Sequence, residues 1–252
     1  MEATVYEQFA KLEEDHFWFQ GRRRIFFDLL DRALRADGLA QRTSTTRVLE
    51  IGCGAGGMLG PLSRYGKVTG LDIAHDYLAY CRRRGHRDVV HGSGYELPFA
   101  DSSFDLVALF DTIEHIPDDV RVLSEVKRVL RPGGRVFISV PAYQFLYSQN
   151  DRVAHHLRRY TATQLRSAVE RAELRVEKLS YFNTFLFPLI LPAIMVLKLK
   201  ERLLGLPEGQ TNLSHQFSKP VNAAFGFVMS SERLWLRHMQ FPFGHSLIAM
   251  AG

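Results

Sequence analysis

The chain has 252 residues, which is enough to bury a substantial core in one large domain or two small ones. Apolar residues make up 46% and charged residues 23%, and this balance excludes wholesale disorder. Two cysteines, Cys53 and Cys81, cannot staple a secreted scaffold and fit a reduced, intracellular protein. The net charge of +5 is too mild to indicate a nucleic-acid binder. The N-terminal stretch is mixed and acidic, unlike a signal peptide, so we expect a cytoplasmic protein.

The first half of the chain alternates between strand and helix patterns after an N-terminal helical region. Residues 5–37 predict one or two helices with a break near Gly21 and a stop at Gly38, and 41–46 form a polar connector. Strands are then expected at 47–51, 67–72, 88–91, 104–110 and 135–140, and helices at 57–65, 75–84 and 117–130. This alternation is typical of a parallel sheet with helices on both faces.

The rhythm changes after residue 141. We expect a polar, aromatic loop over 141–160, a helix at 161–172 with Thr161 as its cap, and strands at 174–182 and 246–251. Residues 184–242 are expected to be an irregular apolar insertion before the last strand. The prediction is a doubly wound, mostly parallel seven-stranded α/β sheet. Residues 1–40 would form a helical lid, and 41–252 the main domain.

A glycine-rich turn follows the first strand and opens the next helix. Gly52, Gly54 and Gly57 satisfy a dinucleotide fingerprint, and Asp72 lies where a carboxylate accepts hydrogen bonds from a ribose diol. Glu50 lies at the end of the strand before the turn, where it would repel a pyrophosphate. It suits a ligand with an ammonium and a sulfonium, and S-adenosylmethionine carries both. Cys53 within the turn is expected to be a small packing residue.

Four segments within residues 46–141 resemble the motif series of class I S-adenosylmethionine-dependent methyltransferases: VLEIGCGAG, VTGLDIA, ELPFADSSFDLVALFDTIEHI and RVLRPGGRVFISVP. The resemblance implies a Rossmann-like fold and S-adenosylmethionine as cofactor, with no metal. It also implies a set of cofactor-binding residues: Glu50, Gly52, Gly54 and Gly56 at the methionine end, Asp72 on the ribose, Ile73, Gly94 and Tyr95 by the adenine, and Asp111 beside the methionine. Ser93 stands where the family often has Asp, which predicts a weaker bond to the adenine.

The loop over 141–160 follows a strand whose carboxyl end faces the ligand crevice, so it is the expected acceptor site. Asp151-x4-His156-x-Arg158-Arg159-Tyr160 resembles a methyltransferase subgroup often found near glycan and lipid biosynthesis, as does the N-terminal stretch His16-Phe17-Trp18-Phe19-x2-Arg22. We expect His156 to be a general base with Asp151 as its orienting partner and Tyr160 beside them, and His155 is the competitor. The alternative is that His156 and Tyr160 only fasten the loop.

Other residues are candidates for binding the acceptor, each with a structural alternative. Arg158 and Arg159 either bind an anionic acceptor or pair with local acids. His115 lies near the pocket by the resemblance, or is structural, and Trp18 forms a lid or packs at the N-terminus. Tyr143 and Tyr147 complete this set.

The apolar insertion is the strongest indication of the acceptor. Its run 185–197 is too short to cross a bilayer and has a basic flank. The insertion caps a pocket for a greasy or lipid-like molecule, contacts a membrane peripherally, or forms a homodimer face. We expect methyl transfer to an oxygen, nitrogen or carbon of a small or lipid-like acceptor, with oxygen favoured because His156 could deprotonate a hydroxyl. The alternatives are an RNA methyltransferase, a non-catalytic cofactor-binding regulator and a nicotinamide dehydrogenase; no nucleic-acid partner is expected.

Overall fold

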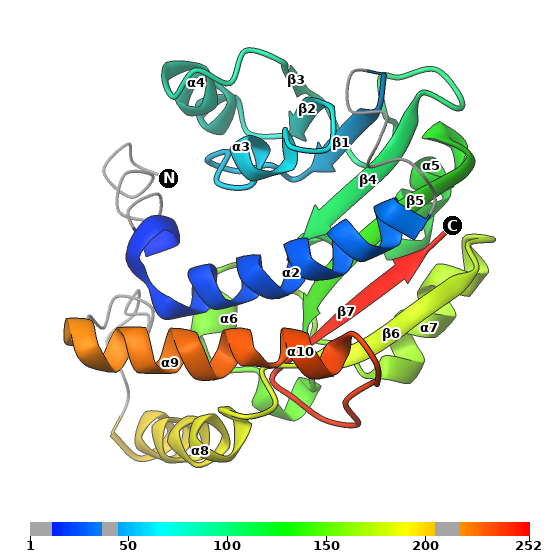
Figure 1. Cartoon of the computed structure of the whole chain (residues 1–252). Helices are drawn as coiled ribbons and strands as arrows, with labels where there is room; N and C mark the ends of the chain where they lie inside the picture. The colour runs from blue at the N-terminus through cyan, green and yellow to red at the C-terminus, as the bar shows by residue number, and fades with distance from the viewer. Residues whose placement is uncertain (1–11, 37–44, 205–216) are drawn as a thin grey trace.

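The computed structural model describes residues 12–36, 45–204 and 217–252, and it is built around one seven-stranded sheet (Figure 1). The strand order is β3-β2-β1-β4-β5-β7-β6. All neighbours are parallel except β7, which is antiparallel to both β5 and β6. The predicted doubly wound, mostly parallel sheet is confirmed. The strands are β1 (Arg47–Ile51), β2 (Lys67–Asp72), β3 (Val89–His91), β4 (Phe104–Phe110), β5 (Leu130–Pro141), β6 (Val176–Phe182) and β7 (Ser246–Ala251).

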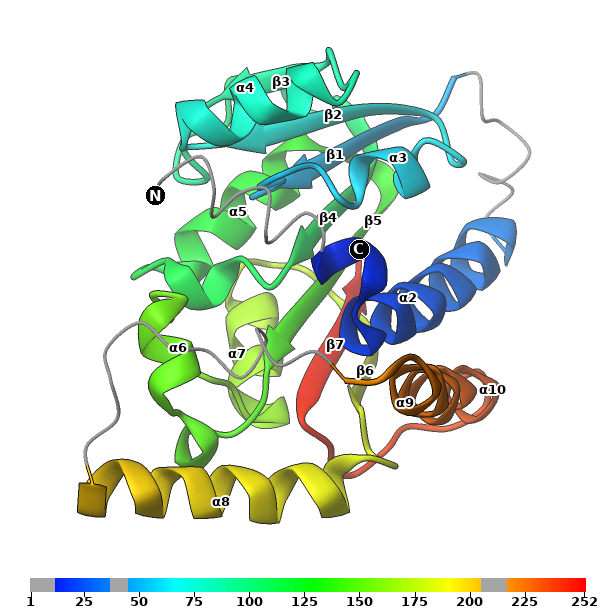
Figure 2. The same ribbon diagram turned by 90° about the vertical axis from the view of Figure 1, so that its left-hand side faces the viewer.

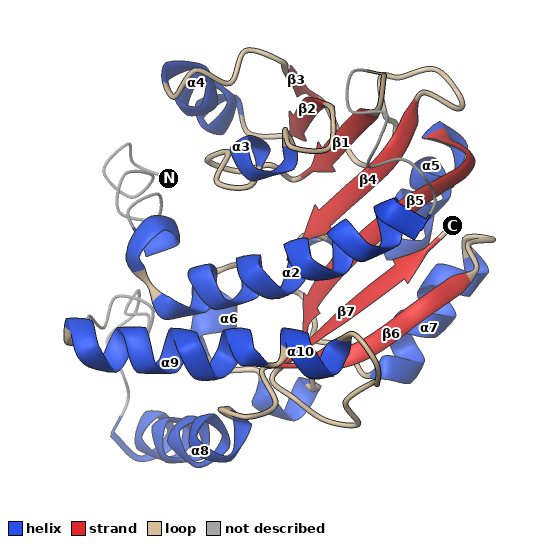
Figure 3. Ribbon diagram, in the orientation of Figure 1, coloured by secondary structure: helices blue, strands red, loops and turns tan. Residues whose placement is uncertain are grey.

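Helices cover both faces of this sheet, as Figure 3 shows by colour. One face carries α2 (Phe17–Ala36), α3 (Leu59–Leu62) and α9 (Lys219–Ser231), with α10 (Arg233–Leu236) continuing from α9, and the other carries α5 (Asp119–Val129) and α7 (Ala162–Arg171). The helix α4 (His75–Arg83) packs beside β2 and β3. Two further helices, α6 (Gln149–Val153) and α8 (Phe187–Leu204), lie beyond the ends of the central strands (Figure 2).

The central strands are apolar because both of their faces are covered. From Leu106 to Leu109 every side chain of β4 is fully buried, and all six residues of β7 are buried. Phe26 of α2 closes the layer from one side: its ring lies 5.5 Å from the ring of Phe110 and 5.1 Å from that of Phe137. The helix α2 is therefore held to the sheet by aromatic packing.

The N-terminal helical region differs from the prediction in where it breaks. The helix α2 runs through Gly21 without interruption, and the break lies at His16, after a helical turn over residues 12–15. A Cβ at Gly21 would lie 2.8 Å from Met229 Sδ, so the glycine lets α2 and α9 come into contact. The expected break was wrong because this glycine serves close helix packing. The expected stop at Gly38 lies outside the described residues.

The expectation of an irregular insertion over 184–242 is also wrong. In its described part this segment forms α8, α9 and α10. The helix α8 could not be recognised from the sequence because apolar residues surround most of its circumference, so no polar stripe repeats with the helical period. Pro192 inside the segment also argued against a helix. Among the residues that the structure describes, no helix is both long enough and apolar enough to span a bilayer.

The topology brings the insertion to the same edge as the expected site. Because β7 runs antiparallel to its neighbours, the end of β6 pairs with the start of β7, and Phe182 and Pro141 both lie opposite Ser246. The loop after β5 and the insertion after β6 therefore leave the sheet side by side. The strand order therefore places two segments that the sequence linked to the acceptor, 141–160 and 184–242, next to each other at one edge.

Two segments of the insertion are joined by a buried carboxyl group, that of Glu232. Its side chain is inaccessible to solvent, and its Oε1 accepts a 2.8 Å hydrogen bond from Phe185 N. Burial raises the pKa of Glu232 to about 7, while backbone hydrogen bonds from residues 183–185 oppose the rise. The folded protein thus favours the protonated carboxyl.

Glu232→Gln should remove a pH dependence of stability. As the pH rises from 4.5 towards 7, the unfolded chain loses this proton and the folded chain keeps it. The free energy of unfolding therefore falls by about 3 kcal/mol over this window and by no more above it. Urea unfolding should show the variant gaining stability over the wild type between about pH 5 and about pH 8. An equal difference at both values would contradict the assignment.

Candidate functional site

The glycine-rich turn between β1 and α3 has the backbone that the sequence requires. Gly52, Gly54 and Gly56 have φ angles of 73°, 50° and 82°, in the region that favours glycine. A Cβ at Gly54 would meet no atom within 4 Å, so the turn faces open space there. Asp72, at the end of β2, accepts hydrogen bonds from Gly54 N at 2.8 Å and from Ala74 N at 2.9 Å. This carboxylate fixes the turn against the second strand.

Two acids, the buried Glu50 and the half-buried Glu13, lie beneath and above the turn. Glu50 is 3% exposed and one of its oxygens has no hydrogen-bond partner. Burial raises the pKa of Glu50 well above its usual range, and the nearby Glu13 raises it further. Glu13 comes from the N-terminal segment, and a Cβ at Gly57 would collide with its carboxylate. An uncompensated acid in this position favours a cationic ligand over a diphosphate.

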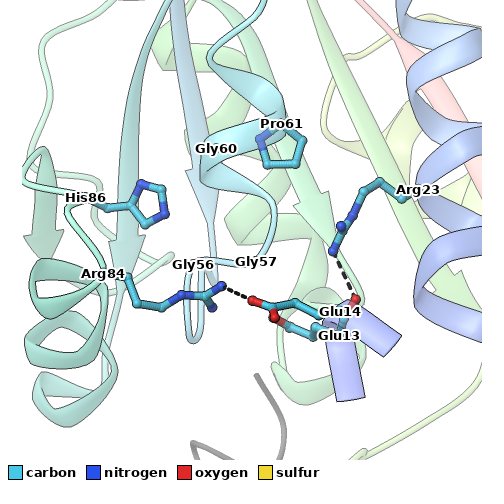
Figure 4. A pocket seen from close by; sticks show the side chains of 9 residues that line it. All are labelled: Glu13, Glu14, Arg23, Gly56, Gly57, Gly60, Pro61, Arg84 and His86. Carbon is cyan, nitrogen blue, oxygen red and sulfur yellow. Dashed lines mark hydrogen bonds and ion pairs between the residues drawn. The ribbon is translucent and has the colours of Figure 1, made fainter. Parts of the chain in front are cut away.

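The pocket beside the turn is closed on one side by the N-terminal segment (Figure 4). Glu13 and Glu14 lie across from Gly56 and α3, and Arg84 forms a 3.0 Å ion pair with Glu14. The segment is also held by a 3.2 Å hydrogen bond from the Arg23 guanidinium to the carbonyl oxygen of Glu13. The first part of the chain thus lies over the expected cofactor turn.

The residues expected near an adenine lie together after β2 and β3. The Ile73 side chain is 69% exposed, an unusual position for an apolar residue that a ring could cover. Ser93 Oγ accepts a 3.2 Å hydrogen bond from Tyr95 N, and Tyr95 Oη accepts one from Asp118 N at 3.1 Å. A Cβ at Gly94 would lie 3.3 Å from the Val122 side chain, so this turn packs closely on α5.

Asp111 lies directly after β4 in a left-handed backbone conformation, with a φ of 51°. Such a conformation is unfavourable for a residue with a side chain and needs support from its surroundings. Ser139 supplies that support: its carbonyl oxygen accepts from Asp111 N at 3.0 Å, and its hydroxyl donates to Asp111 Oδ1 at 3.1 Å. The other carboxylate oxygen forms an ion pair with Arg22 of α2. Asp111 therefore joins the helical N-terminal region to the strand ends.

A second cluster centres on Asp151, which is 1% exposed. Its carboxylate accepts from His156 Nδ1, from Arg159 Nε and from Ser148 N, each at 2.8 Å. Burial alone would raise the pKa of Asp151, but the hydrogen bonds from His156 and Arg159 outweigh burial and hold it well below its usual range. Asp151 is thus a carboxylate, and its contact with His156 Nδ1 places the ring hydrogen on that nitrogen.

The opposite nitrogen of His156 faces two further titratable groups. His156 Nε2 lies 3.9 Å from Glu114 Oε1, beyond hydrogen-bond distance, and the His115 ring lies 4.7 Å from the His156 ring. Glu114 is fully buried and neither carboxyl oxygen has a hydrogen-bond partner. Burial raises the pKa of Glu114 well above its usual range, and Asp111 adds to the rise.

These three side chains present atoms of the types that bind metals, all within 4.8 Å of one another. Ligands that share one zinc ion lie about 3.3 Å apart, as follows from bond lengths of about 2.0–2.1 Å in a tetrahedron. His156 Nε2 and Glu114 Oε1, at 3.9 Å, are farther apart than that. We therefore interpret the cluster as acid–base groups.

Several residues expected to touch the acceptor are engaged within the protein instead. Arg158 donates to the carbonyl oxygens of Pro117 at 2.6 Å and Ile116 at 3.2 Å. Arg159 is bound to Asp151, so both guanidinium groups make contacts within the protein, and a role in binding an anionic acceptor stays a prediction.

The tyrosines and Trp18 also make internal contacts. Tyr160 Oη donates to Asp119 Oδ2 at 2.6 Å, and Tyr147 Oη donates to the carbonyl oxygen of His156 at 2.8 Å. Both hydroxyls therefore help to position the loop, as in the alternative that Tyr160 fastens it, and a part for Tyr160 in catalysis stays a prediction. The Tyr143 ring stacks on Tyr181 at 5.1 Å, and the Trp18 ring on Phe182 at 6.1 Å.

His155 adopts a left-handed conformation with a φ of 60° and turns its carbonyl oxygen to His115 Nδ1 at 3.3 Å. Its side chain is exposed, whereas that of His156 is bound to Asp151. Between the two neighbouring histidines, the structure thus distinguishes one with an orienting carboxylate from one without. His156 is the better candidate for a base.

Three residues of this site were missed from the sequence. Arg22 and Glu114 lie inside motifs that the sequence did single out, the N-terminal aromatic stretch and the segment around His115. Burial was the signal that distinguishes them, and it cannot be seen in a single sequence. Glu13 had no signal at all, because its position over Gly57 depends on how the N-terminal segment folds back.

Comparisons with known proteins agree with this geometry. Residues 49–138 match the family model described as a methyltransferase domain. The chain is 34% identical over 172 residues to a probable S-adenosylmethionine-dependent methyltransferase of Mycolicibacterium smegmatis, which covers 66% of this chain and 62% of that protein. It is also 43% identical over 94 residues to a fatty-acid O-methyltransferase of the same species, which covers 35% of this chain and 34% of that protein.

A solved structure shows the same fold. The crystal structure of an S-adenosylmethionine-dependent methyltransferase from Archaeoglobus fulgidus superposes with a TM-score of 0.53 at 20% identity, over 90% of this chain and 93% of that one. The chain spans about three fifths of the length of the curated relatives that it matches over the longest stretches. Residues 49–138 are thus similar to a methyltransferase domain, and the rest of the chain shares the fold of such enzymes.

Asp72→Ala should weaken binding of S-adenosylhomocysteine by about ten- to hundredfold, because hydrogen bonds to a charged group contribute about 1.5–3 kcal/mol. The variant loses both an acceptor for the ribose and the bond that fixes Gly54. Calorimetric titration measures the effect. Asp76→Ala, in the exposed first turn of α4, is the matched control and should bind normally. Equal affinities for Asp72→Ala and the wild type would refute the ribose assignment.

Proposed function

We propose that this chain, whose residues 49–138 match a methyltransferase domain, is an enzyme that uses S-adenosylmethionine to methylate an oxygen of a small, lipid-like acceptor. The observation that carries the proposal is the pair of Asp151 and His156. A histidine oriented by a buried carboxylate, at the edge where the cofactor turn and Asp111 lie, is arranged to accept a proton. Acceptors with a hydroxyl need such a group, whereas acceptors with a free electron pair on a neutral amine do not.

The residues on this edge divide the work between alignment and proton transfer. When bound, S-adenosylmethionine supplies a methyl group on a sulfonium, a leaving group that needs no further activation. Asp151 holds the His156 ring through Nδ1, which leaves the lone pair on Nε2 to take the hydroxyl proton as the acceptor oxygen attacks the methyl carbon. The glycine-rich turn and Asp72 would hold S-adenosylmethionine, which would give up its methyl group and leave as a neutral thioether. Arg159 donates a hydrogen bond to the same carboxylate and so helps to hold the Asp151 and His156 side chains in place.

Glu114 lies beside His156 as an uncharged side chain. Because burial favours its protonated form, it places no negative charge beside the nitrogen that receives the proton. Tyr160 and Tyr147 are positioning residues that hold the loop ends, through Asp119 and the His156 carbonyl oxygen. The N-terminal segment with Glu13 acts as a lid over the cofactor, which is consistent with its place against Gly57.

The acceptor class is proposed from the surroundings of this loop. Tyr143 stacks on Tyr181 and lies 6.1 Å from the Phe187 ring at the start of α8, so aromatic side chains flank the acceptor loop. The similarity to a fatty-acid O-methyltransferase supports a greasy acceptor and oxygen as the methylated atom. We place the enzyme in the cytoplasm, where it meets an acceptor that partitions into membranes.

The experiment that tests the proposal follows labelled methyl groups from S-adenosylmethionine into lipid and metabolite extracts. Mass spectrometry of the labelled product identifies the methylated atom. We expect a methyl ether of an apolar molecule, because a hydroxyl is the oxygen acceptor that needs a base. Transfer to RNA, or to no component of any extract, would count against the proposal.

His156→Ala should lower turnover of that acceptor by about 10²–10⁴-fold, the range for loss of a general base. Calorimetric affinity for S-adenosylhomocysteine should stay close to that of the wild type, because no residue of the glycine turn is changed. His238→Ala removes an exposed histidine after α10 and serves as the matched control. Full activity of His156→Ala would reduce its role to fastening the loop.

A further inference from the structure

The helix α8 presents large apolar side chains to solvent, whereas the exposed side of a surface helix is usually polar. Leu189, Val196 and Leu203 are spaced seven residues apart, just under two turns, and so share one side of the helix. Their exposed fractions are 64%, 51% and 70%, and Leu199 on the same side is 56% exposed. An ordinary surface helix presents polar residues here.

Two charged side chains near the C-terminal end of α8, those of Lys198 and Glu201, contact the domain. Lys198 Nζ donates a 2.7 Å hydrogen bond to the carbonyl oxygen of Phe145, and Glu201 forms an ion pair with Arg152. The polar groups are thus used to attach α8 to the domain. What remains outside is a largely apolar stripe, with the exposed Lys200 among its leucines near the C-terminal end, and water covers this stripe at a cost.

We propose that this outer stripe of α8 lies in the surface of an anionic lipid bilayer. The two charged residues that stay exposed, Lys200 and Arg202, are both basic, and the one acid of the helix, Glu201, is already paired with Arg152. A basic flank on an apolar stripe fits a layer of anionic headgroups. A second copy of this chain fits less well, because in a symmetric contact of α8 against α8 the basic residues would find no free acid on the opposite helix.

The position of α8 in the molecule allows this contact. In Figure 2 it runs along one margin of the molecule, away from the layers that cover the sheet. Phe145, which is 55% exposed, lies beside it, and the Phe187 ring at its start lies 6.2 Å from that of Phe243, which is 45% exposed. Aromatic side chains at the border of an apolar surface suit the headgroup region of a bilayer.

The same contacts link the bilayer to the acceptor loop. Phe145 belongs to the short helix Gln144–Leu146, and Arg152 directly follows Asp151 on α6. A lipid-like acceptor would then pass from the bilayer to His156 along the helix Gln144–Leu146 and α6, which both contact α8. This part of the inference rests on the proposed function; the contact with the bilayer does not.

Flotation of the full chain with vesicles tests the contact without cofactor or acceptor. We expect binding to vesicles of phosphatidylcholine with phosphatidylglycerol, weaker binding to phosphatidylcholine alone, and a decrease with salt. Leu199→Glu should lower the bound fraction by about tenfold, the effect expected when one buried leucine contact is lost. Lys200→Glu with Arg202→Glu should remove the preference for the anionic vesicles.

The matched control is Leu234→Glu on α10, where the leucine is 50% exposed, and it should bind like the wild type. Thermal unfolding of each variant shows that it is folded. No binding by the wild type, or an equal loss in Leu234→Glu, would overturn the inference. So would a dimer in sedimentation equilibrium that Leu199→Glu separates into monomers, because the stripe would then be a contact between copies. None of these results depends on whether the chain transfers methyl groups.

Discussion

The acceptor side of the molecule depends on one buried carboxylate, that of Asp151. It is the common partner of an imidazole, a guanidinium and a backbone amide, contributed by three different parts of the loop after β5. Each of these donors would be costly to bury alone, and the guanidinium most of all, at about 3–5 kcal/mol for a charge left without its partner. The loop can therefore be irregular in backbone and still hold the His156 ring in one position.

The conformation of the glycine-rich turn could be predicted from the sequence, although Glu13 above it could not. Glycines in a turn, an acid before it and an acid at the end of the next strand depend on local backbone conformation and on strand order, and both follow from short patterns. Gly52, Gly54 and Asp72 lie as expected for that reason. The strands were equally accessible, since β2, β4 and β7 have the predicted bounds.

The acceptor side could be predicted only in part, because it depends on contacts between distant segments. The sequence singled out Asp151 and His156 but could not show that Arg159 shares the same carboxylate, or that Glu114 is sealed beneath them. The helices after β6 were missed for a different reason. Helix prediction relies on an apolar side that alternates with a polar side, and α8 has apolar residues on its outward side as well. The same exposed apolar residues that prevented its prediction make its surface unusual.

The insertion also has a consequence for how such a protein can change. It joins two antiparallel strands, β6 and β7, whose pairing is complete without it, and it leaves and re-enters the sheet at one rim. Its length and content can vary at little cost to the sheet, because closing a longer loop is inexpensive. The glycine-rich turn thus belongs to the parallel part of the sheet, whereas the variable insertion joins the two antiparallel strands at its other edge. Under the proposed function, exchange of this one segment would change the surroundings of the acceptor and leave the glycine-rich turn unchanged.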